Sequence, residues 1–236
     1  MSRYGLSYRK TGMARYLSHL DLLRTFERAM RRANLPLAYT QGFNPHPKIS
    51  FAAPLSVGIA GLAEYLDVEL LEFWEPERLL AALENQLPSG LKLNLAFVLS
   101  EQVSLMAKTA WAEYQATIQL SPKPDWLKLQ ELTQAYLAQP ALVVNRATKA
   151  VRHRRGQPPL HAYDIRPGLP SLALAQEPDG CTLTFHDKCG SEGNIKPAEV
   201  IDSWLEFVGL KRESLELVRT QLWGENQTSF PEFCQS

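Results

Sequence analysis

The segment Tyr39–Lys48 carries side chains suited to acid–base chemistry. His46 lies between Pro45 and Pro47, and each proline fixes its own φ and favours extended geometry in the preceding residue. A histidine can exchange protons near neutral pH, and a nearby lysine could stabilise negative charge on a reacting phosphoryl group. His46 and Lys48 are therefore the best candidates for catalytic residues.

The same segment is also a candidate contact loop. Gly42 permits a backbone turn that other residues resist. A stiff polar loop that carries an aromatic side chain is typical of a contact site, and the alternative is a rigid turn without a ligand. The candidate contact residues of this loop are Phe43, Asn44, His46 and Lys48.

Arginines form a stripe on the first expected helix. Arg24, Arg28 and Arg31 stand at i, i+4 and i+7, so they share one helical face. Arg32 lies at the edge of this stripe. Guanidinium groups bind phosphate oxygens bidentately, so the stripe predicts contact with phosphate or nucleic acid. The alternative is a solvated helix face, in which Glu27 neutralises only part of the charge.

A second basic segment lies in the later half of the chain and is expected to be an extended loop, because it contains glycine and prolines. Its cations are Lys149, Arg152, Arg154 and Arg155. Such a run would bind RNA mainly through backbone phosphates, and the alternative is a solvated disordered loop. Arg166 is a further candidate RNA contact, and Asp164 is expected to orient Arg166 or to cap a turn.

Sequence motifs for binding metals or nucleotides are poorly represented in this sequence. Cys181, His186 and Cys189 are spaced like ligands, but a strand over 182–185 would place the first two on opposite faces. No closely spaced cysteine triplet could hold an iron–sulfur cluster, and no Walker loop or His-Glu-x-x-His motif occurs. We therefore expect neither a metal site nor a cofactor in this chain.

Composition favours a globular, cytoplasmic protein. The chain has 236 residues, 45% of them hydrophobic, and three cysteines that form no disulfide framework. No apolar run approaches the ~20 residues that cross a membrane, and the N-terminus has no apolar signal core. We expect a cytoplasmic location and no membrane partner.

Charge alternates along the chain although the formal net charge is zero. Basic residues outnumber acidic ones nine to two over residues 1–48 and nine to four over 107–166. Acidic residues outnumber basic ones eight to two over 49–106 and eleven to five over 167–236. The neutral total therefore hides two basic regions able to hold a polyanion.

Hydrophobic periodicity predicts two halves with one topology. The first half is expected to follow the order βαββαβ, with elements near residues 4–8, 18–33, 37–40 with 49–51, 65–71, 77–86 and 91–98. The second half repeats the plan near residues 112–120, 125–137, 142–146, 172–175, 182–185, 197–208 and 215–222, with the basic loop between its second and third main strands.

The predicted fold class is therefore α+β, with tandem ferredoxin-like lobes. The expected domains are residues 1–103, which contain the Gly42–Lys48 loop, and residues 108–223, which contain the basic loop. Residues 224–236 are expected to form a disordered tail.

Short blocks of the first half stand in one order at close spacing. They are Arg15-Tyr-Leu-Ser-His-Leu-Asp21, Arg28-Ala-Met-Arg-Arg-Ala33, Leu35-Pro36, Gly42-Phe-Asn-Pro-His-Pro-Lys48, Pro54-Leu55, Glu64-Tyr65 and Asp67-Val-Glu-Leu70. Together they resemble the uncharacterised radical SAM-linked domain family, densely over about residues 3–70 and more thinly afterwards, at Leu105-Met-Ala107 and Asp164-Ile-Arg-Pro167. In that family the domain lies beside a radical SAM protein or is fused to its C-terminal end.

The resemblance implies a radical SAM partner, separate or fused, which would carry the iron–sulfur cluster and S-adenosylmethionine. The first hypothesis is therefore an RNA-binding accessory domain that presents tRNA or rRNA to this partner and is not catalytic on its own. A second is a metal-free enzyme, centred on His46, that cleaves or modifies RNA. A third is a protein–protein adaptor of the radical SAM protein that contacts no RNA.

Overall fold

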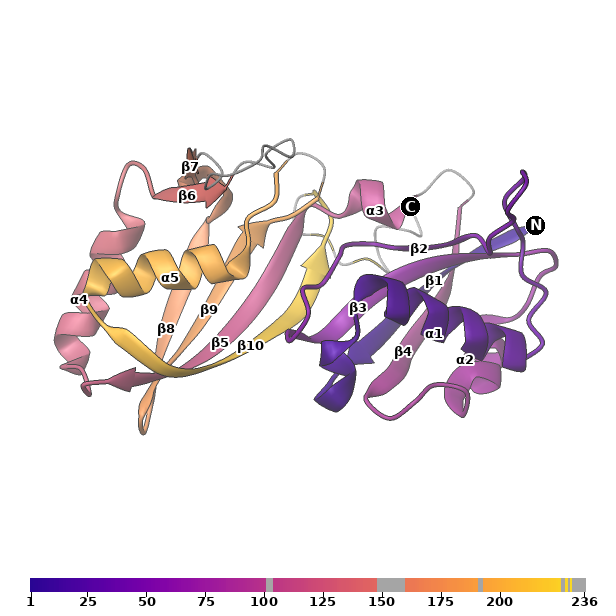
Figure 1. The fold of residues 1–236 in the computed structure, drawn as a ribbon, viewed down its shortest axis with the longest axis horizontal. Helices are drawn as coiled ribbons and strands as arrows, with labels where there is room; N and C mark the ends of the chain where they lie inside the picture. Colours follow the sequence, from indigo (N-terminus) through magenta and orange to yellow (C-terminus); the bar gives the residue numbers. More distant parts are fainter. Residues whose placement is uncertain (101–103, 148–159, 191–192, 226–227, 229, 231–236) are drawn as a thin grey trace, which may run out of the picture. The chain divides into compact units, whose positions relative to one another are not determined.

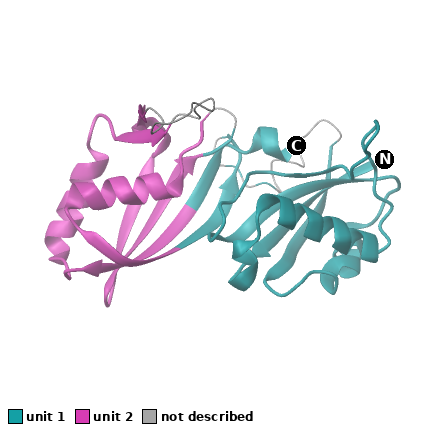
Figure 2. Ribbon diagram, viewed as in Figure 1, with its two compact units in different colours: residues 1–113, 189–192, 217–236 teal, residues 114–188, 193–216 magenta. Residues whose placement is uncertain are grey.

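Two units make up the chain (Figure 2). The computed structural model describes residues 1–100, 104–147, 160–190, 193–225, 228 and 230 (Figure 1). The first unit consists of Met1–Glu113, Cys189–Glu192 and Leu217–Ser236, and the second of Tyr114–Lys188 and Gly193–Glu216. The domain boundaries inferred from the sequence stay a prediction, and the grouping by contacts assigns the end of the chain to the first unit.

The first unit follows the order βαββαβ. Its elements are β1 (Ser2–Lys10), a 3₁₀ helix (Gly12–Tyr16), α1 (His19–Arg32), β2 (Ile49–Phe51), β3 (Ala60–Leu70), α2 (Pro76–Glu84), β4 (Leu91–Leu99) and the short helix α3 (Leu105–Lys108). β1 lies between β3 and β4 and is antiparallel to both. β3 pairs with β2 near its end and, in parallel, with the last part of β10 (Lys211–Trp223) near its start.

The core of the first unit lies between its sheet and helices α1 and α2, which cover the same face (Figure 1). Leu66, Val68 and Leu70 alternate along β3, within the element expected near residues 65–71, and are fully buried. Phe26 of α1 packs edge-on against Tyr8 of β1, with ring centroids 4.9 Å apart. Full burial of such side chains contributes about 1.5–3 kcal/mol each.

The second unit contains the same order of main elements with an inserted hairpin. Its elements are β5 (Trp111–Ser121), α4 (Trp126–Leu137), β6 (Val143–Ala147), β7 (Leu160–Asp164), a 3₁₀ turn (Arg166–Gly168), β8 (Ser171–Glu177), β9 (Gly180–Lys188), α5 (Pro197–Val208) and the first part of β10, up to Glu216. Its sheet has the order β10-β5-β9-β8. α4 and α5 contact each other through a hydrogen bond from the Trp204 indole to the Thr133 hydroxyl, 3.1 Å long.

Two expectations require correction. The segment 142–146 does not join the main sheet of the second unit, because β6 pairs with β7 in a separate two-stranded sheet. The segment 37–40 forms only single bridges, Leu37 with Leu70 and Tyr39 with Pro47, rather than a strand. In the expected tail, Phe230 is fully buried, and its ring centroid lies 4.8 Å from that of Tyr65.

The overall class is mixed α/β with mostly antiparallel pairing. Among the described residues, no helix is both long and apolar enough to cross a membrane.

Candidate nucleic-acid interface

Helix α1 starts at a side-chain cap. The Ser18 hydroxyl accepts a hydrogen bond from the Asp21 amide, 3.2 Å long, and donates one to the Asp21 carboxylate, 2.6 Å long. A capping box is only half formed here, because the Asp21 carboxylate accepts from the serine side chain and not from the serine backbone amide. The cap fixes the register of the helix, so Leu22, Phe26 and Met30 face the core and the arginines face solvent.

The arginine face of α1 consists of Arg24, Arg28, Arg31 and Arg32, and all four side chains are exposed. Arg31 forms an ion pair with Glu27, 2.7 Å long, whereas Arg28 donates to the backbone oxygen of Arg24. Within the described part of the chain, no carboxylate lies within salt-bridge distance of Arg24, Arg28 or Arg32. The face therefore keeps most of its positive charge.

The Gly42–Lys48 loop is closed at its base and exposed at its tip. The Thr40 amide donates to the His46 oxygen, 2.9 Å away, and the His46 amide donates to the Thr40 hydroxyl, 3.0 Å away. Gly42 has a φ of 132°, which side-chain-bearing residues rarely adopt. Phe43, Asn44 and His46 are all exposed, and Phe43 is fully so. Two hydrogen bonds between Thr40 and His46 thus hold the ends of the loop together, in addition to the stiffness predicted from the prolines.

The Lys48 side chain contacts strand β3 rather than the exposed tip of this loop. Its ammonium binds both carboxylate oxygens of Glu69 on β3, at 2.8 and 3.0 Å. The neighbouring pair of Arg3 with Asp67, 2.8 Å long, lines the same hollow of about 290 Å³. No contact joins Lys48 to His46 among the described side chains, so the pair proposed for acid–base chemistry stays a prediction.

The β6–β7 hairpin carries the second basic loop, whose residues Lys149, Arg152, Arg154 and Arg155 lie outside the described residues. Arg146 of β6 stacks on the Tyr163 ring, 3.6 Å from its centroid, and pairs with Glu199 of α5 at 2.6 Å. It also donates to the Asn194 oxygen, 2.9 Å away. Arg146 thereby ties the hairpin to the start of α5.

Asp164 caps the turn after this hairpin. Its carboxylate accepts hydrogen bonds from the amides of Leu142 and Arg166, at 2.8 and 2.9 Å, which is the structural role that the sequence suggested. The Arg166 guanidinium donates to the Leu169 oxygen, 2.9 Å away, and is half-buried. Whether Arg166 also contacts RNA stays a prediction.

We expect Arg146→Ala to lower the free energy of unfolding by about 1–3 kcal/mol at pH 7, the usual loss for hydrogen bonds to a charged group. Burial tends to raise the pKa of the Glu199 carboxyl, but hydrogen bonds from Arg146 and the Lys196 amide and the charges of both residues hold that pKa below its usual range. Because the pKa of Glu199 is lower in the folded protein than in the unfolded chain, its ionised form stabilises the fold at pH values above the unfolded pKa. This stabilisation is lost as the pH falls through the folded pKa.

Urea unfolding at pH 7 and near pH 3 checks this expectation. The difference between wild type and Arg146→Ala should shrink at the lower pH, because protonation of Glu199 removes the charge that Arg146 pairs with. Arg212→Ala is the matched control, because its pair with Asp202 is 3.3 Å long and largely exposed, so it should have little effect at either pH. A difference that is unchanged by pH would show that Arg146 acts through packing alone.

A buried group of polar side chains in the first unit was not predicted. Arg219 of β10 and Glu64 of β3 form a bidentate ion pair with side chains 2% and 1% exposed. Arg219 also donates to the backbone oxygens of Pro54 and Ala53, at 3.1 and 3.3 Å. Lys10 is 1% exposed and donates to the Leu17 oxygen, 3.0 Å away.

Burial affects the titration of this group. It lowers the pKa of Lys10 and raises that of the neighbouring Tyr8 well above its usual range, with the charges of Glu64 and Arg219 as smaller influences. The alternation of side chains along a strand could have revealed these positions. Lys10 is two residues after the inward-facing Tyr8 on β1, and Glu64 is two residues before the inward-facing Leu66 on β3.

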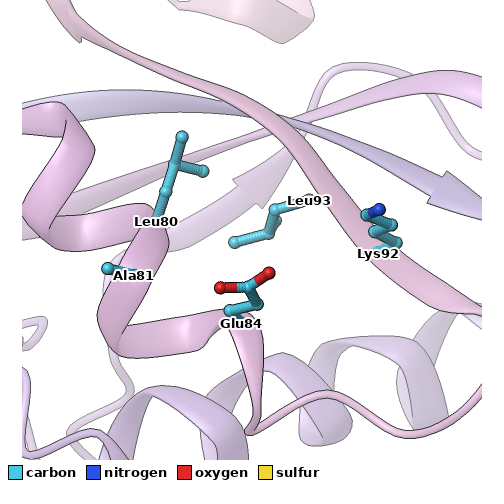
Figure 3. Close-up of a pocket in the computed structure, with 5 residues that line it drawn as sticks. All are labelled: Leu80, Ala81, Glu84, Lys92 and Leu93. Atoms are coloured by element: carbon cyan, nitrogen blue, oxygen red, sulfur yellow. The ribbon is translucent and has the colours of Figure 1, made fainter.

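Other candidate sites offer less chemistry. Cys181 and Cys189 are buried, and burial raises the pKa of Cys181 to about 12, so its thiol stays protonated. The described residues contain no group of three or more His, Cys, Asp or Glu side chains placed to bind a metal. A pocket of about 240 Å³ between α2 and β4 has Glu84 and Lys92 on opposite walls with apolar side chains around them (Figure 3).

Comparisons with solved structures concern the fold. A crystal structure of a Cbf5-Nop10-Gar1 complex contains a chain with a TM-score of 0.52 and 12% identity, and the match covers 98% of this chain. The protein spans about half of that chain, 54% of its length. An unknown protein from Galdieria sulphuraria and a putative glycine cleavage system transcriptional repressor match at 11% and 10% identity, each over 92% of this chain and 98% of the other, but their TM-scores of 0.27 and 0.23 are too low to support a common fold.

No curated protein matches the chain. Residues 3–197, well over half of the sequence, match a protein family, and the chain therefore belongs to the family described as uncharacterized protein conserved in bacteria (DUF2344).

Proposed function

We propose that the protein is a cytoplasmic RNA-binding accessory protein in which two ferredoxin-like lobes present tRNA or rRNA to a radical SAM partner. The arginine face of α1 carries this proposal, because four exposed guanidinium groups share it with a single paired carboxylate, that of Glu27. Helix dipoles favour cations in the last turn, which accounts for Arg31 and Arg32. Arg24 and Arg28 lie further from the helix end, and phosphate binding gives them a role.

The radical SAM partner is supported by the sequence blocks of residues 3–70 that resemble the radical SAM-linked domain family. The partner, separate or fused, would contain the iron–sulfur cluster and bind S-adenosylmethionine. This chain would supply the surface that holds the RNA and no chemical step of its own.

Fluorescence anisotropy with labelled tRNA and rRNA fragments tests RNA binding. If the protein contacts several phosphates, its affinity should fall steeply as salt rises, because each contact displaces counterions from the RNA. Purified protein alone should leave the RNA unchanged in length and mass. Cleavage or a mass change that disappears in His46→Ala would favour the enzyme alternative centred on that residue.

The adaptor function is a second candidate, and the Phe43 side chain favours it. This ring is fully exposed at the tip of a loop whose base is closed by two hydrogen bonds. An exposed aromatic side chain on a stiff loop suits a protein partner as well as a nucleic-acid base. Weak RNA binding that is insensitive to salt, together with tight binding to the radical SAM protein that is lost in Phe43→Ala, would favour the adaptor.

A further inference from the structure

A hollow lies between the arginine face of α1 and the turn that follows α2. Its volume is about 400 Å³, and its lining residues are Thr25, Arg28, Arg32, Gln86, Leu87 and Pro88. The three α1 residues are spaced by three and four positions, so they lie along one line of the helix. The opposite wall is formed by the turn, which contributes an amide side chain and two apolar ones.

Arg32 is held in a fixed orientation beside this hollow. Its Nε donates to the side-chain oxygen of Gln86, 3.2 Å away, and its Nη2 donates to the backbone oxygen of the same residue. A guanidinium group has five N–H donors, so these bonds leave others for a ligand. Arg28 uses its Nε for the Arg24 oxygen, 3.2 Å away, which leaves both of its Nη groups available. Groups already oriented lose less entropy when they bind.

We propose that this hollow binds one nucleotide of an RNA strand, with the phosphate between Arg28 and Arg32 and the ribose and base against Leu87 and Pro88. The inference rests on the proposed RNA binding and assigns it a defined subsite. Two guanidinium groups match the charge and hydrogen-bonding geometry of a phosphodiester. The apolar wall beside them suits the less polar part of a nucleotide, which free phosphate does not have.

The test uses the full-length protein and the dinucleotide pUpU, followed by amide chemical shifts in NMR spectra. The dinucleotide should shift the signals of residues 25–32, 86, 87 and 89, whereas uridine and inorganic phosphate should shift them less at equal concentration. Gln86→Ala should weaken binding of pUpU and of longer RNA about threefold to tenfold, because Arg32 loses the side-chain bond that orients it and keeps only its bond to the backbone oxygen, without any change in net charge. Gln130→Ala, at an exposed position of α4, is the matched control and should have no effect.

A second variant guards against a folding defect in Gln86→Ala. Pro88 is exposed, and Pro88→Glu leaves the bonds of Gln86 in place while adding a negative charge beside the hollow, so it should also weaken binding. If RNA binds but pUpU shifts no signal near the hollow and both variants bind normally, the subsite is wrong and the proposed function stands. If wild type binds no RNA at low salt, the proposed function and the subsite both fail.

Discussion

Arg219→Ala should lower the free energy of unfolding by about 3–5 kcal/mol, the range for breaking a buried ion pair by removing one partner. The side chains of Arg219 and Glu64 are 2% and 1% exposed, so the variant would leave the Glu64 carboxylate buried without its counter-charge. Two backbone oxygens, of Ala53 and Pro54, would lose a donor as well. Urea unfolding at pH 7 measures the effect.

Two further variants show whether the charge is responsible. Arg212→Ala removes an exposed arginine from the same strand and should cost less than about 1 kcal/mol. Arg219→Met combined with Glu64→Leu removes both charges, and it should recover part of the loss because no unpaired charge stays buried. If Arg219→Ala is as stable as wild type, the buried pair does not hold β10 on β3. If the double variant is less stable than Arg219→Ala, the unpaired charge is not the cause of the loss.

Changing Arg24, Arg28 and Arg31 together to glutamine should weaken RNA binding by roughly two orders of magnitude or more at low salt. The three arginines position the phosphate backbone, so the weakening should be similar for RNAs of different sequence. The slope of log affinity against log salt should become shallower by about 2 for a single strand, because each phosphate that an arginine neutralises contributes about 0.7 to that slope. Fluorescence anisotropy over a range of salt concentrations gives both quantities.

The matched control removes the same charge elsewhere. Lys92, Lys128 and Lys211 are exposed and lie outside α1, so their joint change to glutamine alters the net charge equally. This control should bind RNA nearly as well as wild type. Equal weakening in both triple variants would mean that only net charge matters, and unchanged affinity in the α1 variant would favour the adaptor function.

The elements with strong local signals were predictable from the sequence. The bounds of α5 agree with the predicted 197–208, since Pro197 starts this helix and Gly209 ends it in the left-handed region with a φ of 71°. The alternation of apolar and polar side chains near residues 65–71 likewise indicated the strand β3. The arginine spacing placed three side chains on one face of α1 and Arg32 at its edge, and the structure shows all four exposed.

The features that sequence reasoning missed depend on interactions between distant residues. The pair of Lys48 with Glu69, twenty-one positions away, was not foreseen, and a joint role of Lys48 and His46 stays a prediction. Glu64 was counted as an ordinary acidic residue, and only the pairing of β10 with β3 brings Arg219 to it. The β6–β7 hairpin was missed because its two paired strands are far apart in the sequence, with no short turn signal between them.

The most direct test of RNA binding through α1 is ultraviolet crosslinking in cells, followed by sequencing of the bound RNA and mass spectrometry of the crosslinked peptides. The account predicts enrichment of particular tRNA or rRNA fragments, crosslinks in peptides from α1 and the Gly42–Lys48 loop, and loss of both in the variant that replaces Arg24, Arg28 and Arg31. Recovery of no RNA above background, or crosslinks that persist unchanged in that variant, would contradict it.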